Sequence, residues 1–566
     1  MMNTTTANTA FSLFPSLWHR LSLRPWVLAL LFISSLLAVP LMVVFASVFI
    51  ASGDVWQHLL DTVLADYIIN SLLLMAGVGF MVLPLGIIPA WLVTMYRFPA
   101  SRQLEWALLL PLAMPAYIIA YTYTGLLDVG GPLQMLLRDY FGWQYGEYWF
   151  PEVRSLGGAI IMLSLVLYPY VYLLSRSAFI EQSVCVLEVS RTLGCGPYRA
   201  FFKVALPLAR PAIMVGISLV LMETLADYGT VQYFGVSTFT TGIFRTWFGL
   251  GSSVAAAQLS ALLMSFVLML VLIESWSRQQ ARYHHTSNRY RTLPNLRLRG
   301  WPMVLAISAC AVPVMFGFIV PSVQLSVWAL QTYSDVVDKA FFVLIGSSIA
   351  LAASTALVAL VLALFIAYGK RLQNNMLTKM AVRLVGMGYA FPGTVIAVGV
   401  LLPFAWLDNT IDAWMQTHFN INTGLLLSGT VFALMFAYLV RFLPLALNTV
   451  DASLTKIKPS MDEAGRCFGM SAGRLLRNVH IPMMRGSLLT AVLLVFVDVL
   501  KELPATLILR PFNFNTLAIR TYELANEELL ADAACPALAI VLVGIIPVII
   551  LSYSISQSRP GHATRS

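Results

Sequence analysis

Charged side chains are scarce in this chain. Asp, Glu, Lys and Arg make up 11% of its 566 residues, whereas 59% are hydrophobic; an average soluble domain carries roughly 25% charged residues. The deficit excludes an ordinary soluble domain and indicates a polytopic membrane protein. The net charge of +9 does not predict a nucleic-acid partner, because the basic residues are distributed among the loops rather than gathered on one soluble face.

Motifs for catalysis, metal binding and phosphate binding are also missing. The five cysteines form no CxxC pair, so neither a disulfide framework nor a zinc site is indicated. No GxxxxGK[ST] loop occurs, so the chain is not expected to hydrolyse ATP. No Ser-His-Asp arrangement or HExxH motif stands out, and the adjacent His284 and His285 lie in a basic linker. We therefore expect no catalytic residue, no stable metal site and no bound cofactor.

Long apolar runs are present instead. A run of about 20 apolar residues crosses a hydrocarbon layer of ~30 Å as a helix. The first run, 26–50, is longer than the apolar part of a cleaved signal peptide, so we interpret it as a retained span. The runs do not alternate polar and apolar residues, which excludes barrel strands. Twelve spans are predicted, near 26–50, 68–94, 104–126, 157–178, 211–227, 254–276, 302–325, 341–368, 384–406, 424–447, 486–500 and 534–556. Prolines inside these runs, Pro111, Pro115 and Pro392, are expected to kink them.

Two stretches of the chain share one residue pattern at a constant offset of 275. An offset kept over more than forty residues indicates a tandem duplication. The chain is thus predicted to be an all-α membrane protein of two homologous six-helix halves. The repeated residues are Glu188, Arg191, Gly194 and Pro207 in the first stretch and Glu463, Arg466, Gly469 and Pro482 in the second.

Each stretch resembles the cytoplasmic EAA loop of ABC importer membrane subunits. In that family the loop forms a short coupling helix that docks on the ATPase, so the resemblance implies an ATPase-coupling role for the eight repeated residues and a type I importer fold. The helix dipole favours an acid such as Glu188 in the first turn. Gly194 and Gly469 suit a helix C-terminus, and Pro207 and Pro482 suit a helix start. A generic amphipathic loop is the alternative, which two copies in register disfavour.

Basic residues predict the orientation. The side that carries both EAA-like stretches holds 28 of the 35 Lys and Arg residues, and the positive-inside rule places that side in the cytoplasm. The loops 51–67 and 407–423 contain Asp but no Lys or Arg and are expected outside. The predicted units are a cytoplasmic tail (1–25), a first permease domain (26–277), a basic cytoplasmic linker (278–300), a second permease domain (301–557) and a cytoplasmic tail (558–566).

Four carboxylates also recur at the 275 offset, near the outer ends of the fifth and eleventh spans. They are Glu223 and Asp227 in the first half and Asp498 and Glu502 in the second. Members of each pair are four residues apart, so each pair is expected to share one helix face. Ionisable groups at membrane depth usually mark a pathway. We predict that these four acids, with Tyr228, line a substrate pathway or gate.

Simpler explanations for these residues stay open. Acids near a helix end are also found in headgroup water, and Lys501, next to Glu502, is placed to neutralise one of the four. Tyr228 and Tyr233 are more often interfacial aromatics than ligands. The chemistry of these side chains supports the pathway interpretation, because carboxylate and phenol oxygens suit a hard, highly charged cation.

A narrower resemblance concerns the segments 223–243, which begins Glu-Thr-Leu-Ala-Asp-Tyr-Gly-Thr-Val, and 502–514, which begins Glu-Leu-Pro-Ala-Thr. Both are similar to ferric-iron importer permeases, a family with two fused six-helix halves, and the likeness covers nearly the whole chain. It implies alternating-access import of Fe(III) from a periplasmic binding protein across the bacterial inner membrane. Two copies of a separate cytoplasmic ATPase would use the ATP and Mg. The first coupling loop departs from the pattern, with Val189 and Ser190 replacing two alanines.

Other functions remain open at this point. Related fused permeases carry thiamine or other small solutes, and a polyamine or a phosphonate is conceivable as cargo. A secondary transporter driven by an ion gradient is also built from repeats. It would need neither an ATPase nor matched Glu…Gly…Pro loops, which makes it the weaker alternative. A membrane-embedded scaffold or sensor is weaker still.

Overall fold

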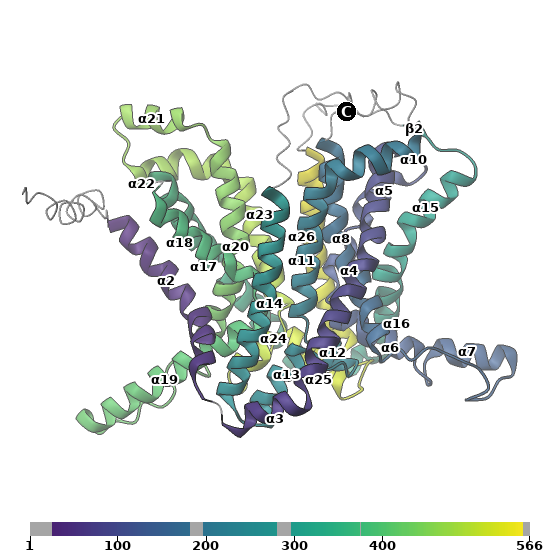
Figure 1. The fold of residues 1–566 in the computed structure, drawn as a ribbon, viewed down its shortest axis with the longest axis horizontal. Helices are drawn as coiled ribbons and strands as arrows, with labels where there is room; N and C mark the ends of the chain where they lie inside the picture. The colour runs from purple at the N-terminus through teal and green to yellow at the C-terminus, as the bar shows by residue number, and fades with distance from the viewer. Residues whose placement is uncertain (1–24, 52, 182–195, 280–295, 374, 558–566) are drawn as a thin grey trace, which may run out of the picture.

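The computed structural model describes residues 25–51, 53–181, 196–279, 296–373 and 375–557. Within these ranges the chain is helical except for one parallel pairing of two-residue strands, β1 (Tyr96–Arg97) with β2 (Leu296–Arg297) (Figure 1). The predicted all-α class is therefore confirmed. Most of the predicted linker, 278–300, the first 24 residues of the predicted N-terminal tail and the whole predicted C-terminal tail lie outside the described residues.

Helices occupy all twelve positions predicted to cross the membrane. In the described part of the chain ten are long and apolar enough to span a bilayer, and an eleventh candidate, 104–126 in the prediction, is a helix pair bent by 93°. The last position holds α26 (Ala534–Gln557), whose described apolar part, Ala534–Ile550, is shorter than a full span. The count from length and composition is thus ten or eleven rather than twelve.

The first half contains the following helices: α2 (Pro25–Ala46), η1 (Ser47–Phe49), α3 (Asp54–Thr62), α4 (Leu64–Met95), α5 (Ser101–Ala107), η2 (Leu110–Ala113), α6 (Ala116–Leu127), α7 (Pro132–Phe141), α8 (Leu156–Glu181), α10 (Pro197–Ala200), η3 (Phe201–Ala205), α11 (Leu206–Ala226), α12 (Gly229–Tyr233), α13 (Phe239–Phe244), η4 (Arg245–Gly249) and α14 (Ser253–Gln279). The second half ends with α26 and, before it, contains α15 (Trp301–Val314), η5 (Met315–Ile319), α16 (Val320–Val336), α17 (Lys339–Leu372), α18 (Met376–Gly386), η6 (Met387–Ala390), α19 (Gly393–Phe419), α20 (Val431–Lys456), α21 (Pro459–Cys467), α22 (Ala472–Leu475), η7 (Leu476–His480), α23 (Ile481–Leu500), α24 (Pro504–Leu509) and α25 (Leu517–Asn526).

The two halves repeat one another element by element. Helices α8 and α20 begin and end 275 residues apart, and the π-helical turns η3 and η7 keep the same offset. Each half packs three long helices together, α4, α8 and α11 in the first and α17, α20 and α23 in the second. The duplication inferred from side-chain spacing is thus present in the backbone.

The first span of each half packs against the other half. Helix α2 contacts α18 and α19, whereas α15 and α16 contact α4, α5 and α6. The approach of α2 to α19 is close: a Cβ on Gly399 would lie 2.4 Å from the carbonyl oxygen of Pro40, so only glycine fits there. Because each half packs its first span against the other half, the two halves interlock and their facing surfaces lie at the centre of the molecule (Figure 1).

Breaks in the helices shape that centre. Pro115 is the N-cap residue of α6, where the path bends by 93°, and Pro392 is the N-cap residue of α19. Pro111 lies in the first turn of η2. Proline has no N–H to donate to a preceding turn of helix, so interrupting the helix at these positions loses no backbone hydrogen bond from that residue. The kinks expected at Pro115 and Pro392 are thus helix starts.

Candidate functional site

Helix α21 stands at the end of the molecule opposite α3 and beyond the ends of the long helices (Figure 1). It carries Glu463 and Arg466, both exposed. Gly469 follows with φ 73°, and its N–H donates to the carbonyl of Arg466 at 2.9 Å, while the N–H of Met470 donates to Gly465 at 3.0 Å. These two bonds form a Schellman motif, which satisfies the last carbonyls of the helix.

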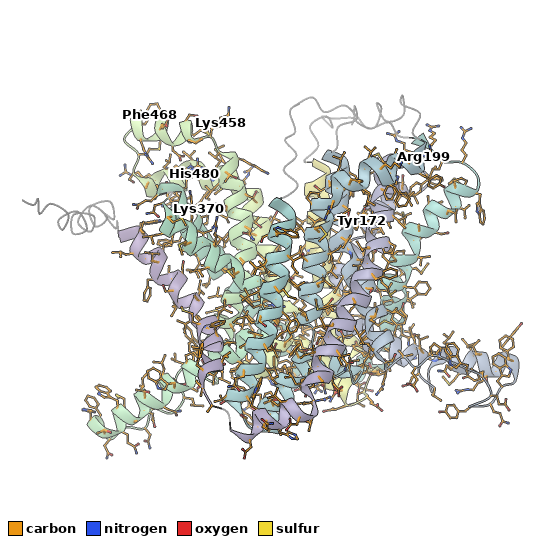
Figure 2. All side chains as sticks on the ribbon, in the orientation of Figure 1. Tyr172, Arg199, Lys370, Lys458, Phe468 and His480 are labelled. Atoms are coloured by element: carbon orange, nitrogen blue, oxygen red, sulfur yellow. The ribbon has the colours of Figure 1, made fainter. Side chains whose placement is uncertain are left out.

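The exposed surface of α21 is available for a partner. Phe468, at its tip, is 84% exposed, and Lys458 lies at its other end (Figure 2). No other described part of the chain covers this surface. After α22 and η7 the chain enters α23, whose first turn contains the exposed Pro482.

The first copy of this stretch is only partly described. Glu188, Arg191 and Gly194 lie outside the described residues, so the expectation of an acid in the first turn remains a prediction. Pro207 lies in the first turn of α11, as Pro482 does in α23. In the second copy the acid of the first turn is Asp462 and not Glu463.

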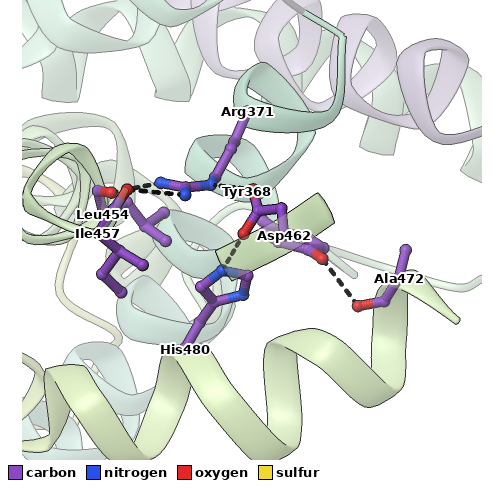
Figure 3. A network of polar contacts seen from close by, with 7 residues as sticks. All are labelled: Tyr368, Arg371, Leu454, Ile457, Asp462, Ala472 and His480. Atoms are coloured by element: carbon purple, nitrogen blue, oxygen red, sulfur yellow. Dashed lines mark hydrogen bonds and ion pairs between the residues drawn. The ribbon is translucent and has the colours of Figure 1, made fainter. Parts of the chain in front are cut away.

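Asp462 holds α21 onto two membrane helices (Figure 3). Its Oδ2 accepts a hydrogen bond from Nε of Arg371, at the end of α17, at 2.7 Å, and its Oδ1 lies 2.8 Å from Nε2 of His480, which is fully buried before α23. Partial burial alone would raise the pKa of the Asp462 carboxyl, but the hydrogen bonds from Arg371 and His480 outweigh it and hold the pKa below its ordinary value. An ionised carboxylate accepts only, so Nε2 carries the proton.

The same arginine also satisfies the end of α20. Arg371 donates to the carbonyl oxygens of Leu454 and, at 2.9 Å, Ile457, which are among the last carbonyls of that helix and need donors. Nearby, the hydroxyl of Tyr368 donates to Ala472 at 2.8 Å. We call Arg371, Asp462 and His480 the Asp462 network. Sequence analysis did not find it; the only hint was a carboxylate directly before Glu463.

A second candidate site is a cavity of about 130 Å³ between the two halves. Helices α6, α8 and α11 line it from the first half and α20 and α23 from the second. All five predicted pathway residues line this one cavity: Glu223, Asp227, Tyr228, Asp498 and Glu502. Five polar residues that were not predicted as pathway residues line it too: Tyr117, Tyr170, Tyr389, Arg441 and Lys501.

The second acid of each pair lies just beyond the end of a helix. Helix α11 ends at Ala226 and α23 at Leu500, so Asp227 is the C-cap residue of α11 and Glu502 follows Lys501, the C-cap residue of α23. Both members of each pair line the cavity. Asp227 has ψ 133°, where the backbone leaves the helix. It accepts hydrogen bonds from the backbone N–H groups of Thr230 and Val231, each at 3.1 Å, at the start of α12.

Two cations neutralise the acids of the second half. Nη1 of Arg441 lies 2.9 Å from Oε1 of Glu502, and both side chains are more than 90% buried. Nζ of Lys501 lies 2.7 Å from Oδ1 of Asp498. Lys501 thus neutralises one of the four acids, as the sequence suggested, and that acid is Asp498 rather than its neighbour Glu502. Arg441 lies inside α20, and the buried carboxylate of Glu502 compensates its charge.

The first-half members are placed differently. Tyr228 is buried, with its ring stacked 3.7 Å from that of Phe244, so it forms cavity wall rather than a membrane-interface anchor. Tyr233 lies under the guanidinium of Arg154. Glu223 is half-buried and makes no hydrogen bond or ion pair with any described residue. Across the described ranges no group of three or more His, Cys, Asp or Glu side chains could hold a metal ion.

Comparison with known proteins gives a family and several relatives. The family described as "Binding-protein-dependent transport system inner membrane component" matches residues 82–275 and 359–559, once in each half. The Fe(3+)-transport system permease protein FbpB 2 of Haemophilus influenzae is 27% identical over 546 residues, which cover 93% of this chain and 98% of that protein. The ferric transport system permease protein FbpB of Actinobacillus pleuropneumoniae is 23% identical, covering 78% of this chain and 64% of that protein. The molybdenum transport system permease protein ModB of Escherichia coli is 27% identical over 206 residues, which cover 35% of this chain and 87% of that protein.

Proposed function

We infer the function from one premise: the chain belongs to the family of binding-protein-dependent transport system inner membrane components. It is a multi-pass inner-membrane permease of an ABC importer, a non-catalytic transport subunit that works with an ATPase and a binding protein. We propose that its cargo is Fe(III), delivered by a periplasmic ferric-binding protein. Two copies of one ATPase, which uses ATP and Mg, would serve the two halves, and the chain itself would bind no cofactor.

The observation that carries the cargo proposal is the cavity between the halves. Four carboxylates meet there with only two cations, Arg441 and Lys501, so the lining carries an excess of negative charge when all groups are ionised. That excess favours a cation at the site. Relatives whose names state Fe(3+) or ferric transport match both halves, which supports the same cargo.

An anionic cargo fits the cavity less well. The molybdenum permease ModB is among the relatives, and a binding site for an oxyanion needs free positive groups. Both cations of the cavity are committed to carboxylates, Arg441 to Glu502 at 2.9 Å and Lys501 to Asp498 at 2.7 Å. An oxyanion would have to break a buried ion pair, which is costly.

The proposed mechanism assigns the α21 end to the cytoplasm, as the distribution of basic residues predicts. ATP closes the two ATPase subunits, and their motion is transmitted through α21 and the matching first-half stretch. The inner ends of the long helices then close while the outer ends open towards the binding protein. Hydrolysis resets the pair and opens the cavity inward; the two states must differ in their affinity for the cargo.

The binding protein would dock at the α3 end. Asp54, Asp61 and Asp66 are exposed there. The other predicted acidic loop is braced internally: Asp408 accepts a 2.7 Å hydrogen bond from the N–H of Ser428, and Asp412 accepts one of equal length from Thr423. We therefore place the acidic docking surface on α3 and the start of α4.

The test is reconstitution of the permease with its ATPase and binding protein in proteoliposomes. ATP-dependent accumulation of ⁵⁵Fe(III), lost without either partner, is the expected result, and excess unlabelled thiamine or molybdate should not compete. Accumulation driven by an ion gradient in the permease alone would overturn the ABC mechanism. Transport of thiamine or molybdate in place of iron would overturn the cargo.

A further inference from the structure

We propose that Glu223 is the one carboxylate of the cavity that meets the cargo, and that it selects for a hard cation while the other three acids hold the cavity wall. The proposal rests on the transport function above and deepens it. It divides a set of four repeated acids, which the sequence presents as equivalent, into one cargo-facing residue and three structural ones.

Three of the four acids already have partners. Glu502 is paired with Arg441, and its Oε1 also accepts the N–H of Ala505 at 3.2 Å. Asp498 is paired with Lys501. Asp227 uses both oxygens to cap α12, one of them for the Thr230 hydroxyl at 2.9 Å. Each of these carboxylates would have to give up an existing bond to take a cargo.

Glu223 has no such bond among the described residues. It lies in the last turn of α11, half-buried, on the cavity wall. Arg441 and Lys501 interact with Glu223 electrostatically from a distance, but each makes its direct contact with another acid. A cation in the cavity can therefore reach Glu223 without displacing a direct hydrogen bond or ion pair. Glu223 is thus the acid of the cavity that a cargo can bind at the smallest cost in existing contacts.

A second group on the wall also lacks a partner. Tyr117, 6% exposed, has a buried hydroxyl with no hydrogen-bond partner in the part of the chain that the structure describes. It lines the same cavity, as do Tyr170 and Tyr389. Phenol and carboxylate oxygens are ligands that hard cations prefer. One free carboxylate with neutral phenols would hold a trivalent cation only transiently, which suits a transport path, where a cargo must leave as readily as it enters.

The difference between the halves follows from two positions. Lys501 of the second half corresponds, at the 275 offset, to Ala226, and Arg441 corresponds to Val166. The first half thus keeps both acids but lacks both cations. This predicts that a lysine in place of Ala226 would supply Glu223 with the partner that Asp498 has, at the same spacing of three residues.

The experiment compares Glu223→Gln, Ala226→Lys and the charge-balanced double variant Asp498→Asn with Lys501→Met in the complete reconstituted complex. We expect initial ⁵⁵Fe(III) uptake to fall at least tenfold in the first two variants and less than threefold in the double variant. Stimulation of ATP hydrolysis by the loaded binding protein, which reports docking and coupling, should persist in all three.

A second readout is independent of iron transport. Tb(III) is a hard trivalent cation, and its aromatic-sensitised luminescence on the purified complex should lose one component in Glu223→Gln and Ala226→Lys but keep it in the double variant. If the wild type moves no iron yet shows this Glu223-dependent component, the iron cargo is wrong and the assignment of Glu223 stands. Wild-type uptake in Glu223→Gln, or an unchanged Tb(III) signal in that variant, would overturn the assignment.

Discussion

The two halves share one backbone plan but differ in where their charges are compensated. In the second half Asp498 and Glu502 each have a cation, and α21 is held by Arg371 and His480 through Asp462. In the first half Glu223 makes no direct hydrogen bond or ion pair with a described residue, and the positions that match Asp462 and His480 are Leu187 and Ala205. The two halves have therefore kept the same helix packing after the duplication, but their side chains differ. We call the second half the braced half, because cations hold its acids, whereas the first half has an acid that is open to the cavity.

The largest effect is expected from breaking both coupling stretches. Glu188→Lys together with Glu463→Lys should abolish ATPase association and transport, because each places a cation where the partner is expected to meet an acid. Of the single variants, Glu463→Lys should cost more, since the first stretch departs from the family pattern at Val189 and Ser190. Co-purification of the ATPase measures this, and survival of both association and transport in the double variant would refute the coupling role.

The buried ion pair of the braced half comes next. Arg441→Met should destabilise the protein by about 3–5 kcal/mol, because it leaves the carboxylate of Glu502 buried and unpaired. Adding Glu502→Gln should restore most of the loss. The thermal midpoint of the protein in detergent gives the ranking, and equal midpoints for the single and double variants would show that the pair does not brace the cavity.

The Asp462 network should matter less for stability than for coupling. Asp462→Asn removes a carboxylate that binds Arg371 and His480, at a cost of about 1–3 kcal/mol, and should loosen α21. We expect faster hydrogen exchange in α21 and fewer cargo molecules moved per ATP. The matched control is Asp451→Asn, which breaks the more exposed pair with Lys370; an exposed pair contributes about 0–1 kcal/mol. Equal effects of the two variants would contradict a special role for Asp462.

The smallest effect concerns pH. The pKa of Asp462 is lowered in the folded state, so its stabilising contribution is complete above the unfolded pKa of about 3.9 and is lost as the pH falls below that value, through the folded pKa. The difference in thermal midpoint between wild type and Asp462→Asn should therefore be constant from about pH 7 to pH 5 and shrink below about pH 4. Measuring the difference also in a His480→Asn background removes the imidazole and separates the contribution of Arg371 from that of His480. A difference in midpoint that does not shrink below about pH 4 would contradict the assignment to the Asp462 carboxylate.

The candidate site shows how much of a functional site a residue pattern can predict. The repeat brought Glu223, Asp227, Asp498 and Glu502 together in one prediction, and they do line one cavity. The same pattern could not separate them, because it treats matching positions as equal. The pattern also did not identify Arg441, the residue that compensates Glu502, because the two residues are 61 positions apart in the chain.

The sequence by itself determined the all-helical membrane class, the duplication and the positions of the repeated acids, because apolar run length and residue spacing are properties of the chain taken in order. Only the tertiary structure decided which acids are neutralised, that the first spans are exchanged between the halves, and that α21 is fastened to α17. These depend on contacts between residues far apart in the chain, such as Arg441 and Glu502, which are 61 positions apart, and such contacts exist only once the helices have packed.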